Sequence, residues 1–164
     1  MFFVGTYELA IDSKNRLSIP HPIRSKLNCD SDGRSFYVGL GQRRGTLAIY
    51  PERYFEKLRA YVPPAELISD EGYAWRQFEF SQSALLDPDT QGRILIPDRL
   101  LKQAGIAKDV TLIGVQDHLE LWRREDFDAF QNENWEKYPE RRTRALSELR
   151  EMRAAEHAAA AAHE

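Results

Sequence analysis

The stretch Asp12-Ser13-Lys14-Asn15-Arg16-Leu17-Ser18-Ile19-Pro20 occurs a second time as Asp89-Thr90-Gln91-Gly92-Arg93-Ile94-Leu95-Ile96-Pro97. Asp, Arg, Ile and Pro keep the same spacing, so the two copies are offset by 77 residues. A pattern that recurs in order at one offset indicates a tandem repeat. The 164-residue chain is therefore expected to fold as two related halves that share one core.

Each copy has the residues of a turn followed by a short strand. An Asp at the first turn position can accept a hydrogen bond from the backbone two residues further on. Asn15 and its counterpart Gly92 belong to residue types that tolerate a positive φ. Apolar and polar residues alternate after each Arg, which predicts a strand. Pro20 and Pro97 then suit the first turn of a helix.

Each half of the chain shows the same predicted order of elements around its turn: strand, turn, strand, helix, strand, strand and helix. Strands are predicted at 3–11, 17–19, 36–40, 46–50, 110–115 and 119–122. Helices are predicted at 22–27 and 97–104, and a further helix is expected to start at 69–71. A loop is predicted at 28–35. The predicted organisation is a first repeat at 1–61, a connecting helix at 62–80, a second repeat at 81–130 and a tail at 131–164. The tail is charged and rich in alanine, with only a thin apolar stripe, so we expect a helix that is poorly packed or depends on a partner, with a disordered end.

Composition restricts the class of protein. Hydrophobic residues make up 42% of the chain and charged residues 30%, as in a soluble globular protein. No apolar run approaches the ~20 residues of a membrane-spanning helix, and the N-terminus has no signal-peptide pattern. The single cysteine, Cys29, cannot form an internal disulfide. A cytoplasmic protein without a membrane partner is expected.

Charge is unevenly distributed along the chain. Residues 1–60 contain ten Lys and Arg against six Asp and Glu, whereas residues 61–140 contain eight against sixteen. A basic first half can present a local positive face although the net charge is −3. Ordinary scatter of surface charges remains the alternative explanation.

The chemistry of the repeated turn allows two functions. Asp12 can hold Arg16, and Asp89 can hold Arg93, because residues four apart face each other across a tight turn. An Arg fork fixed in this way is suited to phosphate or guanine, and Lys14 and Gln91 lie near the turn tips where a phosphate or base edge could be reached. A salt bridge that only stabilises the turn explains the same residues.

Catalytic and metal sites are not predicted. Two Asp residues at a pseudo-twofold axis resemble an aspartic-protease dyad, but each has an Arg partner that lowers the carboxyl pKa, and such a dyad must share a proton. The four histidines lack ligand spacing, and no phosphate-binding glycine loop occurs. We therefore expect no enzyme activity and no cofactor.

The chain resembles the MraZ family. The resemblance is carried by the start Met1-Phe2-Phe3-Val4-Gly5-Thr6-Tyr7-Glu8, by the paired Asp-x-x-x-Arg turns and by Gly114-Val115-x-Asp117-x-Leu119-Glu120-Leu121-Trp122. It covers residues 1 to about 130. The resemblance implies an α+β, mainly β fold: a swapped-hairpin, AbrB-like barrel of two pseudo-twofold repeats with flanking helices and a helical tail. Asn15 stands where a glycine is common in the first turn of the family.

The resemblance also implies a function. It implies a nucleoid-associated transcriptional regulator of the bacterial division and cell-wall gene cluster, which binds short G-containing repeats in double-stranded DNA as a ring-shaped homo-oligomer. The candidate DNA-binding residues are Arg16, Lys14, Asn15, Arg93 and Gln91, and the turn-organising residues are Asp12, Asp89 and Gly92. The first turn is favoured as the DNA reader, because Lys14 is charged and Gln91 is neutral. The alternative is an antitoxin-like or structural module that binds a partner through its tail.

Overall fold

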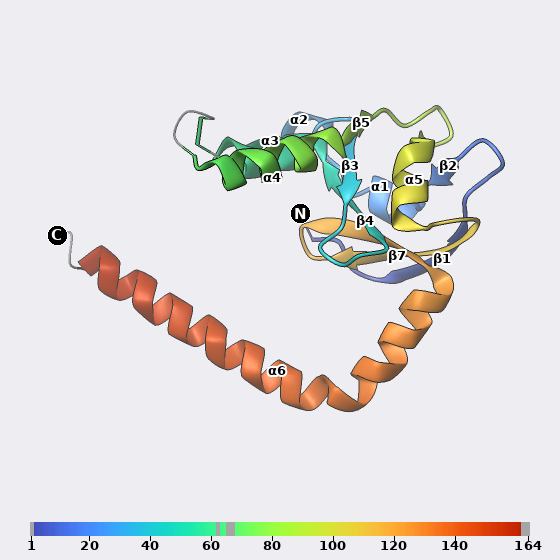
Figure 1. The fold of residues 1–164 in the computed structure, drawn as a ribbon. Coiled ribbons are helices and arrows are strands. Elements are labelled where there is room, and N and C mark those ends of the chain that lie inside the picture. The colour runs from blue at the N-terminus through green and yellow to red at the C-terminus, as the bar shows by residue number, and fades with distance from the viewer. Residues whose placement is uncertain (1, 62, 65–67, 162–164) are drawn as a thin grey trace. The chain divides into compact units, whose positions relative to one another are not determined.

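The computed structural model describes residues 2–61, 63–64 and 68–161 of the chain. The chain divides into two compact units, residues 1–124 and residues 125–164. The first unit is an α+β fold built on antiparallel strands, and the second consists of one long helix (Figure 1). Within the described residues, no helix has both the length and the apolar character needed to cross a membrane.

The first unit contains one six-stranded sheet and one two-stranded ladder, both antiparallel. The sheet has the order β1 (Thr6–Ala10), β7 (Asp109–Val115), β8 (His118–Arg123), β4 (Thr46–Pro51), β3 (Phe36–Leu40) and β5 (Ala84–Leu86), and the ladder pairs β2 (Arg16–Ser18) with β6 (Arg93–Leu95). The sheet ends at β1 and β5 and is not closed, so the predicted barrel is not formed as one continuous sheet. The reason is that the chain leaves each edge strand through a turn, and the strands that follow pair with each other.

The two repeats exchange strands. β1 of the first repeat pairs with β7 of the second, with Leu9 opposite Val110, and β5 of the second repeat pairs with β3 of the first, with Leu86 opposite Phe36. In the centre of the sheet, β4 and β8 pair symmetrically around Ala48 and Glu120. Neither repeat completes its sheet alone, which is why the duplication produces one folded unit.

Six helices lie in the part of the chain that the structure describes. They are α1 (His21–Arg24), α2 (Cys29–Asp32), α3 (Glu52–Ala60), α4 (Asp70–Ser81), α5 (Asp98–Ala104) and α6 (Arg124–Ala161). The predicted helix start at 69–71 is confirmed, because Ser69 caps α4 by accepting a hydrogen bond from the Gly72 backbone.

The loop predicted at 28–35 is partly wrong, because a helical turn, α2, forms inside it. The Asn28 side chain accepts a hydrogen bond from the Asp30 backbone nitrogen, and the Asp32 carboxylate accepts one from the Asn28 backbone nitrogen. This reciprocal capping satisfies backbone donors at the start of the turn. The polar residues that suggested a loop are therefore the residues that cap a helix.

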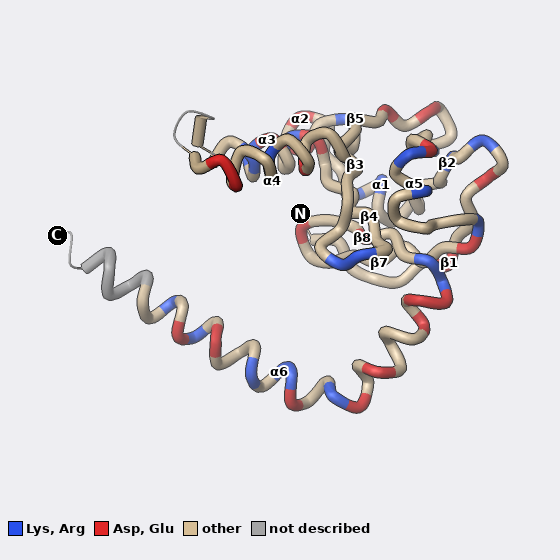
Figure 2. Tube along the Cα trace, in the orientation of Figure 1, with Lys and Arg blue, Asp and Glu red and all other residues tan. Residues whose placement is uncertain are grey.

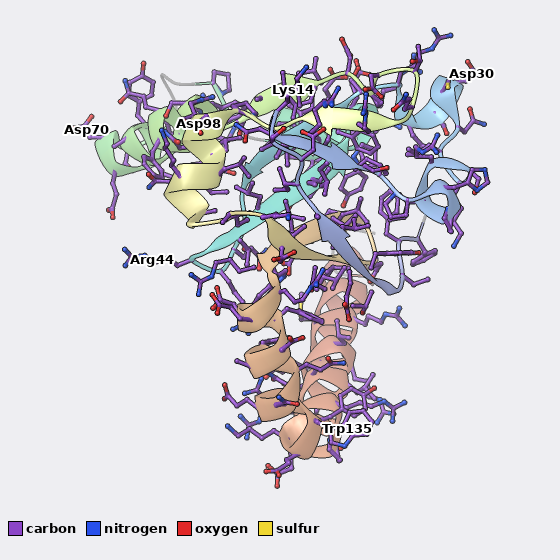
Figure 3. All side chains as sticks on the ribbon, turned by 90° about the vertical axis from the view of Figure 1, so that its right-hand side faces the viewer. Lys14, Asp30, Arg44, Asp70, Asp98 and Trp135 are labelled. Atoms are coloured by element: carbon purple, nitrogen blue, oxygen red, sulfur yellow. The ribbon has the colours of Figure 1, made fainter. Side chains whose placement is uncertain are left out.

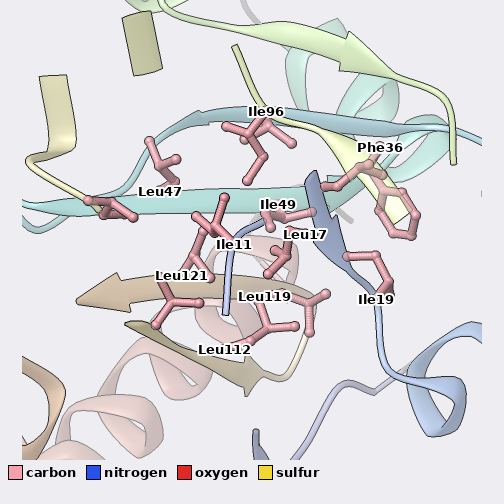
Figure 4. Packing of buried hydrophobic residues seen from close by; sticks show 14 of the residues in the cluster. Ile11, Leu17, Ile19, Phe36, Leu47, Ile49, Ile96, Leu112, Leu119 and Leu121 are labelled. Carbon is pink, nitrogen blue, oxygen red and sulfur yellow. The ribbon is translucent and has the colours of Figure 1, made fainter. Parts of the chain in front are cut away.

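The hydrophobic core of the first unit is built by both repeats (Figure 4). Leu47 and Ile49 from β4 face Leu119 and Leu121 from β8, and all four side chains are fully buried. The short ladder supplies Leu17 and Ile94, also fully buried. Burial of side chains on alternate positions orients the remaining ladder residues toward solvent.

The second unit is the part of α6 from residue 125 onward. Pro139 lies inside this helix, where it lacks the backbone N–H of a helical hydrogen bond, and the ribbon bends in this region (Figure 1). Side chains from 131 to 155 are exposed apart from Asn134, as expected for a poorly packed tail. The backbone is helical up to Ala161, and disorder at the alanine-rich end stays a prediction. Residues 162–164 lie outside the described residues.

Candidate nucleic-acid interface

The first repeated turn is organised by the Asp12 carboxylate. Its Oδ1 accepts hydrogen bonds from the backbone nitrogens of Lys14 at 2.9 Å and Arg16 at 3.0 Å, and its Oδ2 accepts one from Arg16 Nε at 2.7 Å. Hydrogen bonding by the Arg16 backbone is the largest of the effects that lower the pKa of Asp12. One carboxylate therefore fixes both the backbone of the turn and the direction of the arginine.

The second turn reproduces this arrangement residue by residue. Asp89 Oδ1 accepts from the backbone nitrogens of Gln91 at 2.9 Å and Arg93 at 3.0 Å, and Oδ2 accepts from Arg93 Nε at 2.8 Å. Arg93 Nη2 also lies 2.7 Å from Oδ2. The Arg93 side chain is the main cause that lowers the pKa of Asp89 to about 2. The predicted Asp–Arg pairing is confirmed in both turns.

The predicted turn-organising residues adopt the conformation that their type suggested. Asn15 has φ +60° and Gly92 has φ +74°. The Asn15 backbone nitrogen donates to Asp12 O at 3.0 Å, and the Gly92 backbone nitrogen donates to Asp89 O at 2.8 Å. Asn and Gly are the residue types that occupy this left-handed region most readily, so the two turns share one geometry.

The ladder between β2 and β6 brings the two arginines onto one face. Arg16 is opposite Leu95, Leu17 is opposite Ile94, and Ser18 is opposite Arg93. Leu17 and Ile94 face the core, so the other four side chains lie on the solvent side. Arg16 and Arg93 are diagonal neighbours on that side, a relation that places two residues about 7–8 Å apart and within reach of long side chains. We call this surface the ribbon face, comprising Arg16, Ser18, Arg93 and Leu95.

Each turn is anchored by the other repeat. The Ile19 backbone nitrogen donates to Gly92 O at 3.0 Å, and the Ile96 backbone nitrogen donates to Asn15 O at 2.9 Å. The turns therefore stand at opposite ends of the ribbon face. Lys14 and Gln91 are exposed near their tips, and Figure 3 labels Lys14 at the first turn. Figure 2 shows that both signs of charge occur around the turns.

Ser18 and Leu95 are ribbon-face residues that the sequence-based prediction missed. The alternation after each Arg indicated that they share a face with the arginines, but the pairing partner of each strand was not evident. Because β2 and β6 come from different repeats, their register depends on contacts far apart in the sequence. That pairing joins two separate turns into one surface.

Other kinds of site find no support in the described part of the chain. It contains no group of three or more His, Cys, Asp or Glu side chains arranged to hold a metal ion. Cys29 is exposed and forms no disulfide.

The fold and the ribbon face define a protein of two exchanged β repeats that displays two carboxylate-held arginines side by side. The model of one family, described as "MraZ protein, putative antitoxin-like", matches residues 2–71 and 80–155. The chain belongs to the MraZ family.

Named relatives cover most of the chain. A protein of Clostridium tetani named transcriptional regulator MraZ is 36% identical over 80% of this chain and 89% of its own length. Proteins with the same name from Mycoplasma mobile and Heliobacterium modesticaldum are 34% and 32% identical, over 78% and 91% of this chain and 84% and 94% of their own lengths. None of these names denotes an enzyme.

Proposed function

We propose that this chain is a transcriptional regulator that binds double-stranded DNA with the ribbon face. The names of its relatives support a regulatory role. The observation that carries the proposal is the diagonal placement of Arg16 and Arg93, each held by its own carboxylate, on one exposed face. A structural salt bridge that is duplicated with the repeat is the alternative explanation, and the effect of Arg16→Ala on promoter preference separates the two.

The hydrogen bonds leave the guanidinium groups available for a ligand. Arg16 binds Asp12 through Nε, and no hydrogen bond or ion pair between described residues involves its two terminal nitrogens, which suit a guanine edge or a phosphate. Arg93 places Nε and Nη2 against Asp89, which leaves fewer free donors. This difference supports the first turn, with Lys14 and Asn15, as the main base reader, and assigns Gln91 and Arg93 a supporting part.

Finer features of the proposal come from the family resemblance. They are an AbrB-like swapped-hairpin architecture with repeats at 1–61 and 81–130, assembly into a ring, a nucleoid location and recognition of short G-containing repeats at the promoter of the division and cell-wall gene cluster. A ring would display several ribbon faces to repeated half-sites, and such linkage raises avidity beyond that of one contact. This would offset the net charge of −3.

A fluorescence-anisotropy titration of the protein against its own promoter fragment at two salt concentrations tests the proposal. Arg16→Ala is expected to abolish preference for the promoter over a scrambled duplex while leaving the fold and assembly unchanged. Arg44→Ala is the matched control, because Arg44 is an exposed arginine at the β3–β4 hairpin tip (Figure 3). Equal promoter binding by Arg16→Ala, Arg93→Ala and the unaltered protein would refute the proposal.

A second function, partner binding through the tail, is favoured by one observation. Trp135, Tyr138, Leu149 and Met152 of α6 expose between 54% and 78% of their surface. Exposed aromatic and long aliphatic side chains on a helix suit a helix-in-groove partner. Deletion of residues 131–164 separates the two functions: promoter binding is retained if the tail serves only a partner, and is lost if the tail is needed for DNA binding.

A further inference from the structure

The two repeated turns differ at one neighbouring position. Arg24 in α1 occupies the place that Leu101 of α5 occupies in the second repeat, at the same offset of 77 residues as the turns. Leu101 is buried in the core, whereas Arg24 is half-buried. The hydrogen bonds that Asp12 and Asp89 accept within their turns, by contrast, match in the two repeats.

Arg24 does not lie against the turn of its own repeat. Its Nε donates a hydrogen bond to Ile19 O at 2.9 Å, and the backbone nitrogen of Ile19 donates to Gly92 O. A Cβ atom added to Gly92 would come within 2.5–2.6 Å of Nε, Cδ and Cζ of Arg24. The guanidinium therefore covers the backbone of Gly92 in the second turn.

This contact explains why the two turns differ in sequence. Both positions need a positive φ, which Asn15 provides in the first turn. In the second turn, any side chain at position 92 would displace Arg24, so glycine is required there for a second reason. The first turn instead borders a cavity of about 570 Å³ lined by Asn15 and Leu101, among other residues.

The Arg24 guanidinium lies against Gly92, the residue that precedes Arg93 in the second turn. Among the described residues, no hydrogen bond or ion pair involves the two terminal nitrogens of Arg24. A guanidinium that is fixed through Nε and free at both Nη atoms is preorganised for a phosphate. The second turn therefore carries Arg93 and borders Arg24 of the first repeat, where the sequence suggested a neutral tip.

We propose that Arg24 is a phosphate-binding residue of the second turn, so that both ends of the ribbon face engage DNA. This inference rests on the proposed function. Lys14 and Arg16 supply two cations at the first turn, and Arg24 and Arg93 supply two at the second. The basic excess of residues 1–60 thus serves both turns, because strand exchange places Arg24 against the second repeat. A phosphate contact positions the duplex without reading its sequence.

The test measures DNA affinity against salt for Arg24→Leu, which introduces the residue of the second repeat. The matched control is Lys26→Leu, which removes the same charge from an exposed position two residues away. Arg24→Leu is expected to weaken binding to promoter and scrambled duplexes by the same factor. It should also reduce the slope of log K against log salt by about 0.9, the value for one phosphate contact. Lys26→Leu should change the slope by much less.

Two further variants keep the result interpretable if Arg24→Leu perturbs the turn. Arg24→Lys keeps the charge and should restore most of the salt slope, whereas Gly92→Asn keeps the positive φ but displaces Arg24 and should lower the slope. Equal slopes for Arg24→Leu and Lys26→Leu would overturn the inference, as would a loss restricted to the promoter duplex. If Arg16→Ala abolishes promoter preference in the same experiment, the proposed function stands even when the inference about Arg24 fails.

Discussion

Leu17 lies directly opposite Ile94 in the β2–β6 ladder, and the residues on either side of this pair are related by the twofold exchange of the repeats. Arg16 and Arg93 occupy equivalent positions on the two sides, as do Asn15 and Gly92 in the hydrogen bonds that close the ladder. The pair is fully buried. The packing of this pair in the core thus fixes the spacing of the two arginines on the opposite, solvent-facing side of the ladder.

Leu17→Ala and Ile94→Ala are expected to destabilise the protein by similar amounts, about 2–5 kcal/mol each, because both leave a cavity at the same contact. The free energy of unfolding from denaturant titration measures this. Their effects should not add, since the two side chains face each other. Leu95→Ala is the control: Leu95 is 58% exposed, and the expected change is within about 0.5 kcal/mol. A larger loss in Leu95→Ala than in Ile94→Ala would contradict this assignment of faces.

Gly92→Ala is expected to destabilise the protein more than Gly105→Ala. Both glycines have a positive φ, but a Cβ atom at Gly105 meets nothing within 4 Å, whereas one at Gly92 meets Arg24. Strain at φ alone costs about 1–2 kcal/mol for a non-glycine residue. In an Arg24→Ala background, the cost of Gly92→Ala should fall to that of Gly105→Ala. A double-mutant cycle measures this coupling, and a coupling of zero would show that the two residues are independent.

Much of the site was predictable because its chemistry is local. The Asp–Arg pairs and the positive φ at Asn15 and Gly92 all lie within five consecutive residues, where spacing alone determines which groups meet. The register of β2 with β6, the open edges of the sheet and the contact of Arg24 with Gly92 depend on residues more than 45 positions apart. Charge counted along the chain therefore placed the basic excess in the first repeat, although the fold brings Arg24 of that repeat against the second turn.

Asp12→Asn is expected to weaken promoter binding by about two- to tenfold. The amide can still accept the backbone hydrogen bonds of the turn, but it loses the charge that holds Arg16, and ordering a free arginine on binding costs about 0.5–1.5 kcal/mol. The direction of the change in DNA affinity is informative, because removing a negative charge would by itself strengthen binding to DNA.

Asp98→Asn provides the control for this variant. Asp98 is an exposed residue of α5 whose partner is Lys102, and it lines the cavity beside the first turn, so the substitution makes the same change in net charge nearby without altering the hydrogen bonds of Asp12. Anisotropy titrations of both variants on the promoter fragment should show weaker binding only for Asp12→Asn. Stronger binding by both variants would mean that Asp12 acts only through its charge.

The stability of the protein is expected to fall as the pH rises above neutrality, because of His118. Its ring is largely buried, which disfavours the charged form, but the nearby carboxylates of Glu120 and Asp117 outweigh this and raise the pKa of His118. The Asp117 contact, from Nδ1 to Oδ1, is 2.7 Å long. The pKa values of Asp117 and Glu120 are both lowered, so these carboxylates stay ionised at neutral pH, and the pKa of Tyr54, which donates to Asp117, is raised to about 12.

The direction of this pH dependence follows from the linkage between proton binding and folding. A group whose pKa is higher in the folded state stabilises the fold fully below its unfolded pKa of about 6.5, and this stabilisation is lost as the pH rises through the folded value. Thermal unfolding between pH 6 and pH 9 should therefore show a decline in Tm, at about 2–4 °C for each kcal/mol lost. His118→Gln keeps a polar side chain but removes the titration, so its Tm should be lower at pH 6 and change less over this range. An equal decline in both proteins would show that another group causes the pH dependence.

The lost stability should come from the junction between the two repeats. His118 and Glu120 belong to β8, whereas Tyr50, whose ring stacks on His118 at a centroid distance of 4.8 Å, belongs to β4.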